Sequence, residues 1–180
     1  MSLPKNYVII GSPGAGKTTL AKQLSECLNL RAIEMDYYHF THNWVEVPDE
    51  IFCQSIDNLT QQPGWIADGN YGILRKLVWT KAEVIIWLRL PFFLTFRRLF
   101  VRSMDRVFSQ KPLWHGNKES FYTTFFTKDS ILYWFFKTYR QRNRQYDLML
   151  KSAEYAHLKV IMITHPNNVL EQVLSRLNQF

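Results

Sequence analysis

Residues 7–20, YVIIGSPGAGKTTL, decide the fold of this chain. Within them, GSPGAGKT at residues 11–18 matches the G-x-x-x-x-G-K-[ST] pattern of a phosphate-binding loop (P-loop) at every fixed position. Glycines at positions 11, 14 and 16 let the backbone adopt left-handed angles and turn its N–H groups toward one point. Lys17 adds a mobile cation for the β- and γ-phosphates of a nucleotide, and the Thr18 hydroxyl can ligate Mg²⁺. The nucleotide-binding residues that this pattern predicts are Gly11, Ser12, Pro13, Gly14, Ala15, Gly16, Lys17, Thr18 and Thr19.

The residues on either side give this loop the context that it needs. An apolar run at residues 7–10 is typical of a buried strand, and Leu20, Leu24 and Leu28 recur at helical spacing. A helix that begins at about Gly16 would direct its positive end at the same phosphates. A chance match in a glycine-containing loop is the alternative, but strand, loop and helix follow one another in the order that nucleotide binding requires.

Length and composition predict one globular domain over residues 1–180. The chain is 47% apolar, which fits a folded protein, and 180 residues suffice for a substantial core. No apolar run is long enough to span a bilayer, and the N-terminus lacks a signal-peptide pattern, so we expect a cytoplasmic protein with no membrane partner. The net charge of +7 suits polyanionic ligands, although a merely basic surface is the alternative.

Strands alternate with helices along the rest of the chain. Apolar segments predict strands at residues 31–35, 65–67, 84–88 and 159–163, and helical patterns occupy residues 48–59 and 169–177. Such alternation implies a parallel sheet with crossovers on both faces. We therefore expect an α/β fold, a three-layer P-loop sandwich around a five-stranded parallel sheet. Residues 37–44 are polar and aromatic without periodicity, and they predict a loop near the phosphates.

Two acidic residues follow predicted strands. Asp36 comes directly after the second strand, and Asp68 comes directly after the third. Because ligands gather at the carboxyl ends of parallel strands, both carboxylates should face the bound nucleotide. A capping role for Asp36 and a simple Asp-Gly turn at Asp68 are the alternatives.

A long insertion at residues 92–157 has the most unusual composition in the chain. Arg98, Arg102 and Arg106 recur every four residues, so they share one face of a predicted helix. A second helical stretch at residues 129–150 carries further basic residues, Lys137, Arg140 and Arg144, among many aromatic ones. Helices of this kind can close as a lid over a triphosphate and supply positive charge. The alternative is a solvated basic face on an aromatic core.

These blocks together resemble the P-loop nucleotide and small-molecule kinases, the group that includes adenylate and shikimate kinases. More closely, the chain resembles the bacterial topology modulation proteins. This likeness is carried by residues 11–21, 65–71 (WIADGNY) and 113–120 (LWHGNKES), with Asp36, Trp44 and the Arg98/Arg102 pair in order between them. The chain departs from that pattern at Val78, Arg89 and Phe92, which places the acceptor contacts in more doubt than the ATP site.

The resemblance implies an adenylate-kinase-like fold and roles for particular residues. ATP and Mg²⁺ are the implied cofactors, with Thr18 and Asp68 at the metal. Lys17, Asp36, Arg98 and Arg102 are the implied catalytic residues, Asp36 as the base or positioner of the acceptor hydroxyl. The acceptor pocket would be lined by Asp36, His39, Trp44, Asn70 and Tyr71, of which Trp44 and His39 are also explained by a structural role.

The resulting hypothesis is a kinase that transfers the γ-phosphate of Mg·ATP to a small acceptor such as a nucleoside or nucleotide. A different class stays open as the alternative: a nucleotide-dependent protein that binds nucleic acid through the basic, aromatic insertion and affects DNA topology. Against it, the sequence has no helix-turn-helix, zinc-ligand or RNA-binding signature.

Overall fold

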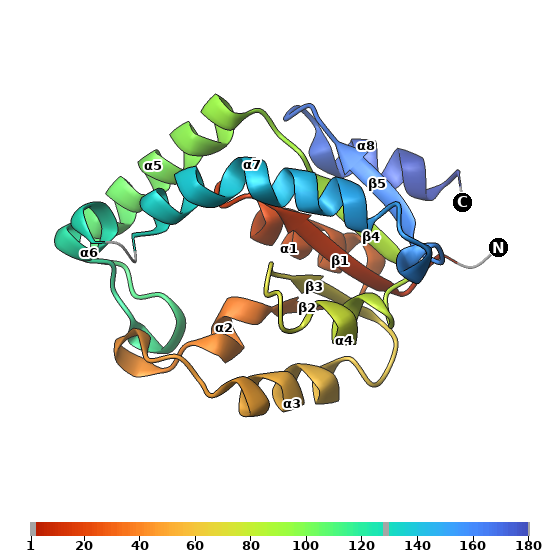
Figure 1. The fold of residues 1–180 in the computed structure, drawn as a ribbon, viewed down its shortest axis with the longest axis horizontal. Helices are drawn as coiled ribbons and strands as arrows, with labels where there is room; N and C mark the ends of the chain where they lie inside the picture. Colours follow the sequence, from red (N-terminus) through yellow and green to blue (C-terminus); the bar gives the residue numbers. More distant parts are fainter. Residues whose placement is uncertain (1–2, 128–129, 180) are drawn as a thin grey trace.

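The computed structural model describes residues 3–127 and 130–179, and within these ranges five strands form one parallel sheet (Figure 1). The strand order is β2-β3-β1-β4-β5, with every neighbouring pair parallel. Their bounds are β1 (Asn6–Gly11), β2 (Arg31–Glu34), β3 (Trp65–Asp68), β4 (Val84–Leu88) and β5 (Lys159–Ile163). The predicted α/β fold with a five-stranded parallel sheet is confirmed.

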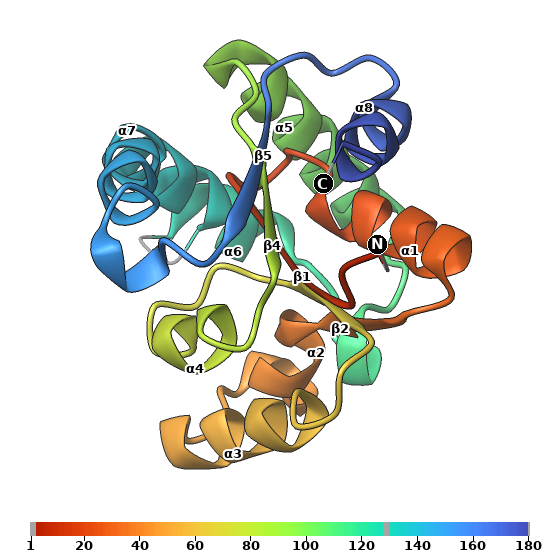
Figure 2. The same cartoon turned by 90° about the vertical axis from the view of Figure 1, so that its right-hand side faces the viewer.

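Helices cover both faces of the sheet, which explains why its central strands are apolar throughout. Val8 and Ile10 of β1 point to one face and pack beneath α3 (Asp49–Leu59), α4 (Arg75–Trp79) and α7 (Ile131–Met149). Tyr7 and Ile9 point to the other face, which is covered by α1 (Lys17–Leu28) and α8 (Val169–Leu177). Figure 2 shows these layers from the end of the sheet.

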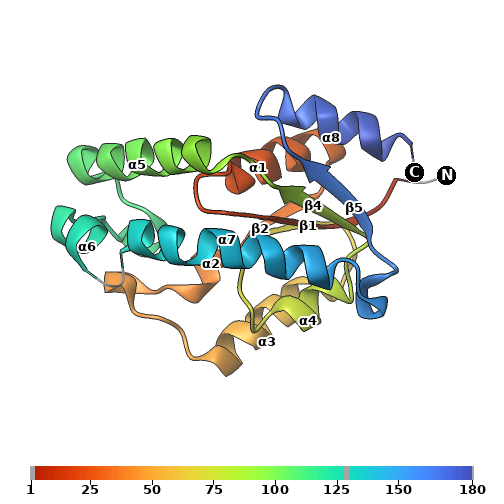
Figure 3. The ribbon, with the colours of Figure 1, turned by 45° about the horizontal axis from the view of Figure 1, so that its top comes forward.

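The insertion after β4 packs around a third apolar cluster in its first part, whereas its last part, with Tyr146 and Tyr155, packs on the sheet face of Val8 and Ile10. It contains α5 (Phe92–Ser109), the short 3-10 helix η2 (Trp114–Gly116), α6 (Phe121–Phe126), α7 and η3 (Ala153–Tyr155). Leu99, Leu132 and Phe135 form the centre of the cluster, so aromatic residues between the charges serve as packing groups. In Figure 3, α5, α6 and the first turns of α7 project beyond the strands, on the side of the β1–α1 loop.

The start of α7 is fixed by a side-chain cap. The Ser130 hydroxyl accepts hydrogen bonds from the N–H groups of Leu132 and Tyr133, so the helix begins at Ile131. Asp129, with which the sequence places the start of this helix, lies outside the described residues. Within the described ranges, no helix is both long and apolar enough to cross a membrane.

The loop predicted at residues 37–44 is wrong, because this segment contains two short helices. A one-turn helix α2 (Met35–His39) directly follows β2, and the 3-10 helix η1 (His42–Trp44) follows it. Elements of three to five residues are too short to produce a hydrophobic period, which is why the sequence pattern does not reveal them. The consequence for the site is that Asp36 lies in the first turn of α2, two residues after the end of β2.

Candidate active site

The P-loop holds its backbone in conformations that glycine favours. Gly14 and Gly16 have φ angles of 80° and 93°, and Gly16 is the left-handed residue directly before α1. The first N–H groups of α1, beginning with Lys17, have no acceptor within the helix and are available to a phosphate. Asn70 stabilises the entry to the loop, since its side-chain amide donates to the carbonyl oxygen of Gly11.

Charged groups from four parts of the chain act electrostatically on Lys17. Burial lowers the pKa of this ammonium, while the carboxylates of Asp68 and Asp36 raise it. Two guanidiniums, those of Arg102 and Arg142, oppose them and lower it further. Two carboxylates and two guanidiniums thus influence the charge of the P-loop lysine, and the contact of Thr18 with Asp68 joins one of these carboxylates to the loop directly.

Asp68 lies at the end of β3 and is almost fully buried, with 5% of its surface exposed. The Thr18 hydroxyl donates a hydrogen bond to its Oδ2 atom. Within the described residues, its Oδ1 atom is buried without a hydrogen-bond partner. Burial raises the pKa of this carboxyl to about 6, although Lys17 and Thr18 act in the opposite direction. An Asp-Gly turn does not explain an unpaired carboxylate oxygen beside the P-loop.

The Thr18–Asp68 pair fits Mg²⁺. Both groups offer oxygen ligands, and a buried carboxylate oxygen without a partner is the kind of atom that a hard cation satisfies. No cluster of three or more His, Cys, Asp or Glu side chains occurs in the part of the chain that the structure describes.

The raised pKa of Asp68 predicts a pH-dependent stability difference. Because the folded pKa of about 6 exceeds the ordinary value of 3.8, the folded state holds this proton more tightly, and its stability declines as the pH rises from about 4 to 7. Asp68→Asn, which resembles the protonated carboxyl, should match the wild type at pH 4 and exceed it above pH 7 by about 3 kcal/mol. Urea denaturation in EDTA at several pH values measures this difference.

The control for this test is Asp105→Asn, at an exposed position on α5. It removes a carboxylate without affecting the buried site. We therefore expect the difference in free energy of unfolding between this variant and the wild type to stay nearly constant with pH. The prediction would be contradicted if Asp68→Asn and the wild type differed in free energy of unfolding by the same amount at pH 4 and at pH 8.

Asp36 is held by a tyrosine from the segment after β3. The Tyr71 hydroxyl donates to Asp36 Oδ1 at 2.6 Å, and burial together with this carboxylate raises the pKa of Tyr71. His39, also on α2, packs against Phe52 and Tyr71 and lies 3.6 Å from a carboxylate oxygen of Glu46. Tyr71 is thus the partner that orients Asp36, while His39 packs among aromatic rings with its Nδ1 atom buried and, within the described residues, without a hydrogen-bond partner, so its contact with an acceptor stays a prediction.

Two further predicted acceptor residues have their polar groups bound within the protein. Asn70 Oδ1 accepts a hydrogen bond from the Tyr146 hydroxyl at 3.1 Å, while its amide nitrogen donates to the carbonyl oxygen of Gly11. The Trp44 indole N–H donates to the carbonyl oxygen of Lys118 at 2.9 Å, and its backbone N–H donates to Asn117 Oδ1 at 3.0 Å. The contact of Asn70 and Trp44 with an acceptor stays a prediction.

The predicted lid arginines differ in their surroundings. Arg102 is exposed like Arg98, but desolvation and Arg106 lower its pKa, whereas Glu119, Asp36 and Asp68 raise it, and its contact with a phosphate stays a prediction. Arg106, on the same face of α5, forms an ion pair with Glu119 at 2.9 Å. Arg98 is exposed and has no ion pair within residues 3–127 and 130–179, so its role also stays a prediction.

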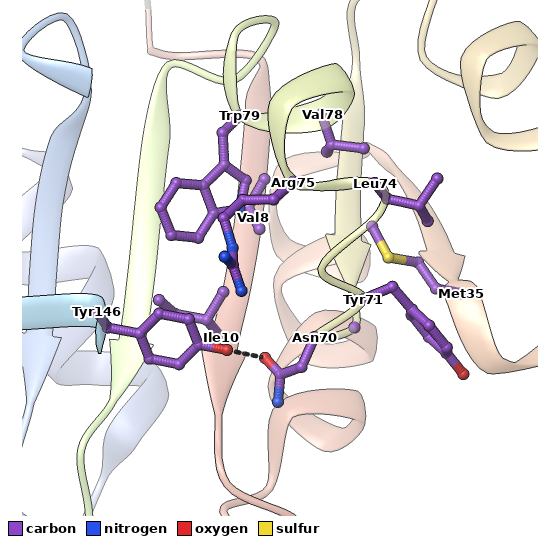
Figure 4. A pocket seen from close by; sticks show the side chains of 11 residues that line it. Val8, Ile10, Met35, Asn70, Tyr71, Leu74, Arg75, Val78, Trp79 and Tyr146 are labelled. Atoms are coloured by element: carbon purple, nitrogen blue, oxygen red, sulfur yellow. Dashed lines mark hydrogen bonds between the residues drawn. The ribbon is translucent and has the colours of Figure 1, made fainter. Parts of the chain in front are cut away.

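The sequence pattern does not single out Arg142 on α7, whereas Arg75 on α4 is a candidate to replace the arginine that the resembled family has at the position of Val78. The basic residues singled out on α7, Lys137, Arg140 and Arg144, are exposed, whereas Arg142 turns inward and stacks on Trp134 with its guanidinium 3.9 Å from the ring centroid. From α4, Arg75 extends between Trp79 and Tyr146, as Figure 4 shows. The spacing of residues on α7 could have revealed Arg142. It lies four residues before the buried Tyr146 and therefore shares the helix face that packs on the sheet.

Comparison with known proteins defines the class to which this fold belongs. A family model for AAA proteins, the ATPase family associated with various cellular activities, matches residues 7–66, about a third of the chain. No curated protein sequence matches the chain significantly. Among solved structures, shikimate kinase from Acinetobacter baumannii has a TM-score of 0.60 at 17% identity, covering 99% of this chain and 94% of that one.

Two further structures give the same result. Gluconokinase from Sinorhizobium meliloti has a TM-score of 0.58 at 13% identity, with 99% and 94% of the two chains covered. Deoxyadenosine kinase from M. mycoides has a TM-score of 0.54 at 12% identity, with 97% and 100% covered. At these identities the likeness shows the fold alone. The chain has the fold of P-loop small-molecule kinases, and the closer resemblance to topology modulation proteins stays a prediction.

Proposed function

We propose that this protein is a phosphotransferase that moves the γ-phosphate of ATP to a small acceptor such as a nucleoside, a nucleotide or another hydroxyl compound. One observation carries the proposal. The P-loop brings Lys17 into electrostatic reach of two different carboxylates, Asp68, which is bound to Thr18, and Asp36, which is bound to Tyr71. A nucleotide hydrolase needs a carboxylate in the position of Asp68. A further carboxylate such as Asp36, held by a hydrogen bond, can accept the proton of an acceptor hydroxyl.

In the proposed reaction the acceptor oxygen attacks the γ-phosphorus in line, the bond from that phosphorus to the β–γ bridging oxygen breaks, and ADP leaves. Asp36 receives the proton of the hydroxyl. Lys17 and the arginines Arg98 and Arg102 stabilise negative charge on the transferred group. When Mg²⁺ is bound, at Thr18 and Asp68 directly or through water, it neutralises charge on the β- and γ-phosphates.

The insertion is part of this proposal. We treat residues 1–180 as one kinase-like domain, and residues 92–157 as a helical lid that excludes water when ATP and acceptor are bound. The names of the similar structures support a small-molecule acceptor in general, because a gluconokinase, a shikimate kinase and a deoxyadenosine kinase share the fold. An ATP-dependent enzyme of this kind would work in the cytoplasm.

The decisive experiment measures ADP release from Mg·ATP against a panel of nucleosides, nucleotides, sugars and hydroxy acids. A Lys17→Ala variant, checked for folding by circular dichroism, is assayed beside the wild type. Turnover that depends on an acceptor and is lost in the variant supports the proposal. ATP binding without acceptor-stimulated turnover would rule out the kinase activity, and a folded wild type that does not bind ATP would rule out any nucleotide-dependent function.

A second candidate function is nucleotide-dependent binding of single-stranded nucleic acid, with an effect on DNA topology. The observation that favours it is a set of exposed aromatic side chains on the insertion, to which bases could stack: Phe93, Phe108, Phe121, Tyr122 and Phe126. Affinity for an oligonucleotide that falls steeply with added salt would support this candidate. The absence of binding at low salt would remove it.

A further inference from the structure

Residues 113–120, LWHGNKES, carry part of the family resemblance, but the proposed reaction does not use them. They form η2 and the stretch that leads from it to α6. In Figure 1 this blue-green stretch lies against the orange chain that follows α2, the helix of Asp36. We call residues 113–119 the strap, because they connect the end of α5 with the segment from α2 to η1.

Asn117 joins the strap to this segment through both ends of its side-chain amide. Its Oδ1 atom accepts a hydrogen bond from the backbone N–H of Trp44 at 3.0 Å, and its Nδ2 atom donates to the carbonyl oxygen of Thr41 at 2.7 Å. Only 4% of its surface is exposed, so the loss of these bonds would leave buried polar groups without partners. An amide offers a donor and an acceptor together, which is what this pair of backbone groups requires.

Two more contacts strengthen the connection. The Trp44 indole N–H donates to the carbonyl oxygen of Lys118 at 2.9 Å, so this residue is bound to the strap through both its backbone and its ring. His115 Nε2 lies 2.8 Å from the carbonyl oxygen of Tyr37, and the two rings pack with their centroids 4.5 Å apart. Tyr37 directly follows Asp36 in the sequence. The strap therefore holds α2 at the residue next to the carboxylate.

The backbone on both sides of this contact has an unfavourable conformation. Asn43 and Trp44 in η1 and His115 in η2 have φ angles of 60°, 57° and 56°. Left-handed angles are costly for residues with a Cβ atom, above all for a side chain as large as that of Trp44. Such residues persist only where the surrounding contacts determine their conformation. Asn117 supplies such a contact for Trp44, because it binds the N–H group of this residue.

The other end of the strap is bound to α5, the helix that contacts the P-loop. Glu119 forms an ion pair with Arg106 at 2.9 Å, with both side chains mostly buried, and its carbonyl oxygen accepts from the Gln110 side chain at 3.2 Å. The first turns of α5 lie against Gly14 of the P-loop, where a Cβ atom would meet the Thr95 carbonyl oxygen. A continuous path of contacts thus leads from the P-loop through α5 and the strap to α2.

Helix α2 depends on contacts of this kind for its position. A helix of one turn has too few internal hydrogen bonds to be stable alone, so its neighbours determine where it lies. Tyr71, in the segment after β3, holds Asp36 itself, and the strap holds the residue beside it. The Asp36 carboxylate is therefore placed by two distant parts of the chain at once.

We propose that Asn117 is a positioning residue for the proposed reaction: by binding the α2–η1 segment to the strap, it makes Asp36 follow the position of the insertion. This inference rests on the proposed function, in which Asp36 receives the proton of the acceptor. Asn117 contacts neither the acceptor nor the nucleotide in this proposal. When the insertion closes over ATP, the strap places the base at the same time, so the site is complete only with the nucleotide bound.

Hydrogen–deuterium exchange, measured by mass spectrometry, tests the connection without an assay of activity. In Asn117→Ala we expect the amides of residues 37–47 to exchange about tenfold faster than in the wild type, while those of β1 and β4 do not change. Mg²⁺ with β,γ-imido-ATP should slow the exchange of residues 37–47 in the wild type but not in the variant. The matched control is Lys118→Gln, which changes an exposed side chain and keeps the carbonyl oxygen that binds Trp44.

Kinetic measurements show whether the connection acts through Asp36. We expect Asn117→Ala to lower kcat about tenfold with the best acceptor from the panel, while KM for ATP stays within about threefold of the wild-type value. In an Asp36→Asn background the same substitution should lower kcat by less than about threefold, because the carboxylate that it displaces is already absent. Asn117→Asp keeps an oxygen for the Trp44 N–H group but cannot donate to Thr41, so its kcat should be intermediate.

Four results would overturn the inference: equal exchange of residues 37–47 in Asn117→Ala and the wild type, faster exchange with unchanged kcat, a KM for ATP raised in parallel with the loss of kcat, or an equal loss of kcat in the Asp36→Asn background. If the wild type has no acceptor-dependent turnover, the proposed function is wrong and the catalytic role of Asn117 with it, whereas exchange still decides whether the strap orders α2 and η1. Should Asn117→Ala fail to fold, Asn117→Asp replaces it in both experiments, with a smaller expected effect.

Discussion

Asp36→Asn should lower kcat for acceptor phosphorylation by about 10²- to 10⁴-fold, because the side chain then has no carboxylate to receive the proton of the acceptor hydroxyl. The substitution keeps an oxygen that can accept from the Tyr71 hydroxyl, now 2.6 Å from Asp36 Oδ1, so the geometry of α2 is preserved. The affinity for β,γ-imido-ATP should change less than about threefold. Initial-rate kinetics with the best acceptor from the panel, together with calorimetry of the analogue, measure both quantities.

Tyr71→Phe is the companion variant. It removes the hydrogen bond that orients Asp36 and leaves the carboxylate in place, so we expect a smaller loss in kcat than for Asp36→Asn. Wild-type kcat in Asp36→Asn would exclude Asp36 as the base. A larger loss in Tyr71→Phe than in Asp36→Asn would instead point to the tyrosine as the group that contacts the acceptor.

The elements that the sequence predicts well are those with a long repeated signal or a rigid motif. β4, β5 and α8 have the predicted bounds because an unbroken apolar run or a helical period defines each of them. The P-loop is equally clear, since its glycines occupy fixed positions around Lys17. By contrast, α2 and η1 were missed because one turn of helix is stabilised by its neighbours and has too few residues for a period.

The site residues also divide into those that a sequence pattern indicates and those that depend on contacts between distant segments. Asp36 and Asp68 could be placed at the phosphates because parallel strands end at a common edge. The sequence could not indicate that Tyr71 would hold Asp36, since this depends on where the segment after β3 meets α2. Arg142 was overlooked for a related reason. The sequence indicates which basic residues share a face of α7, but it does not indicate which single arginine turns toward the aromatic core.

Gly14→Ala should have the most severe effect on the P-loop, because this residue contacts α5 directly. A Cβ atom at position 14 would lie 2.3 Å from the Thr95 carbonyl oxygen and 3.0 Å from the Leu99 backbone nitrogen. Both obstacles are backbone atoms of one helix, so neither can rotate away, and the φ of 80° is itself unfavourable for alanine. We expect a loss of about 2–4 kcal/mol in the free energy of unfolding and at least 100-fold weaker binding of β,γ-imido-ATP.

Gly72→Ala is the matched control, because a Cβ at that position meets no atom within 4 Å and its φ is outside the left-handed region. It should change stability by less than about 0.5 kcal/mol. The comparison also tests how the P-loop and the insertion depend on each other. If Gly14 is the contact that sets the position of α5, its replacement must shift the helix that carries Arg98 and Arg102, and both nucleotide affinity and catalysis should fall together. Urea denaturation and calorimetry that find Gly14→Ala equal to Gly72→Ala would contradict this contact and the arrangement of lid and loop inferred from it.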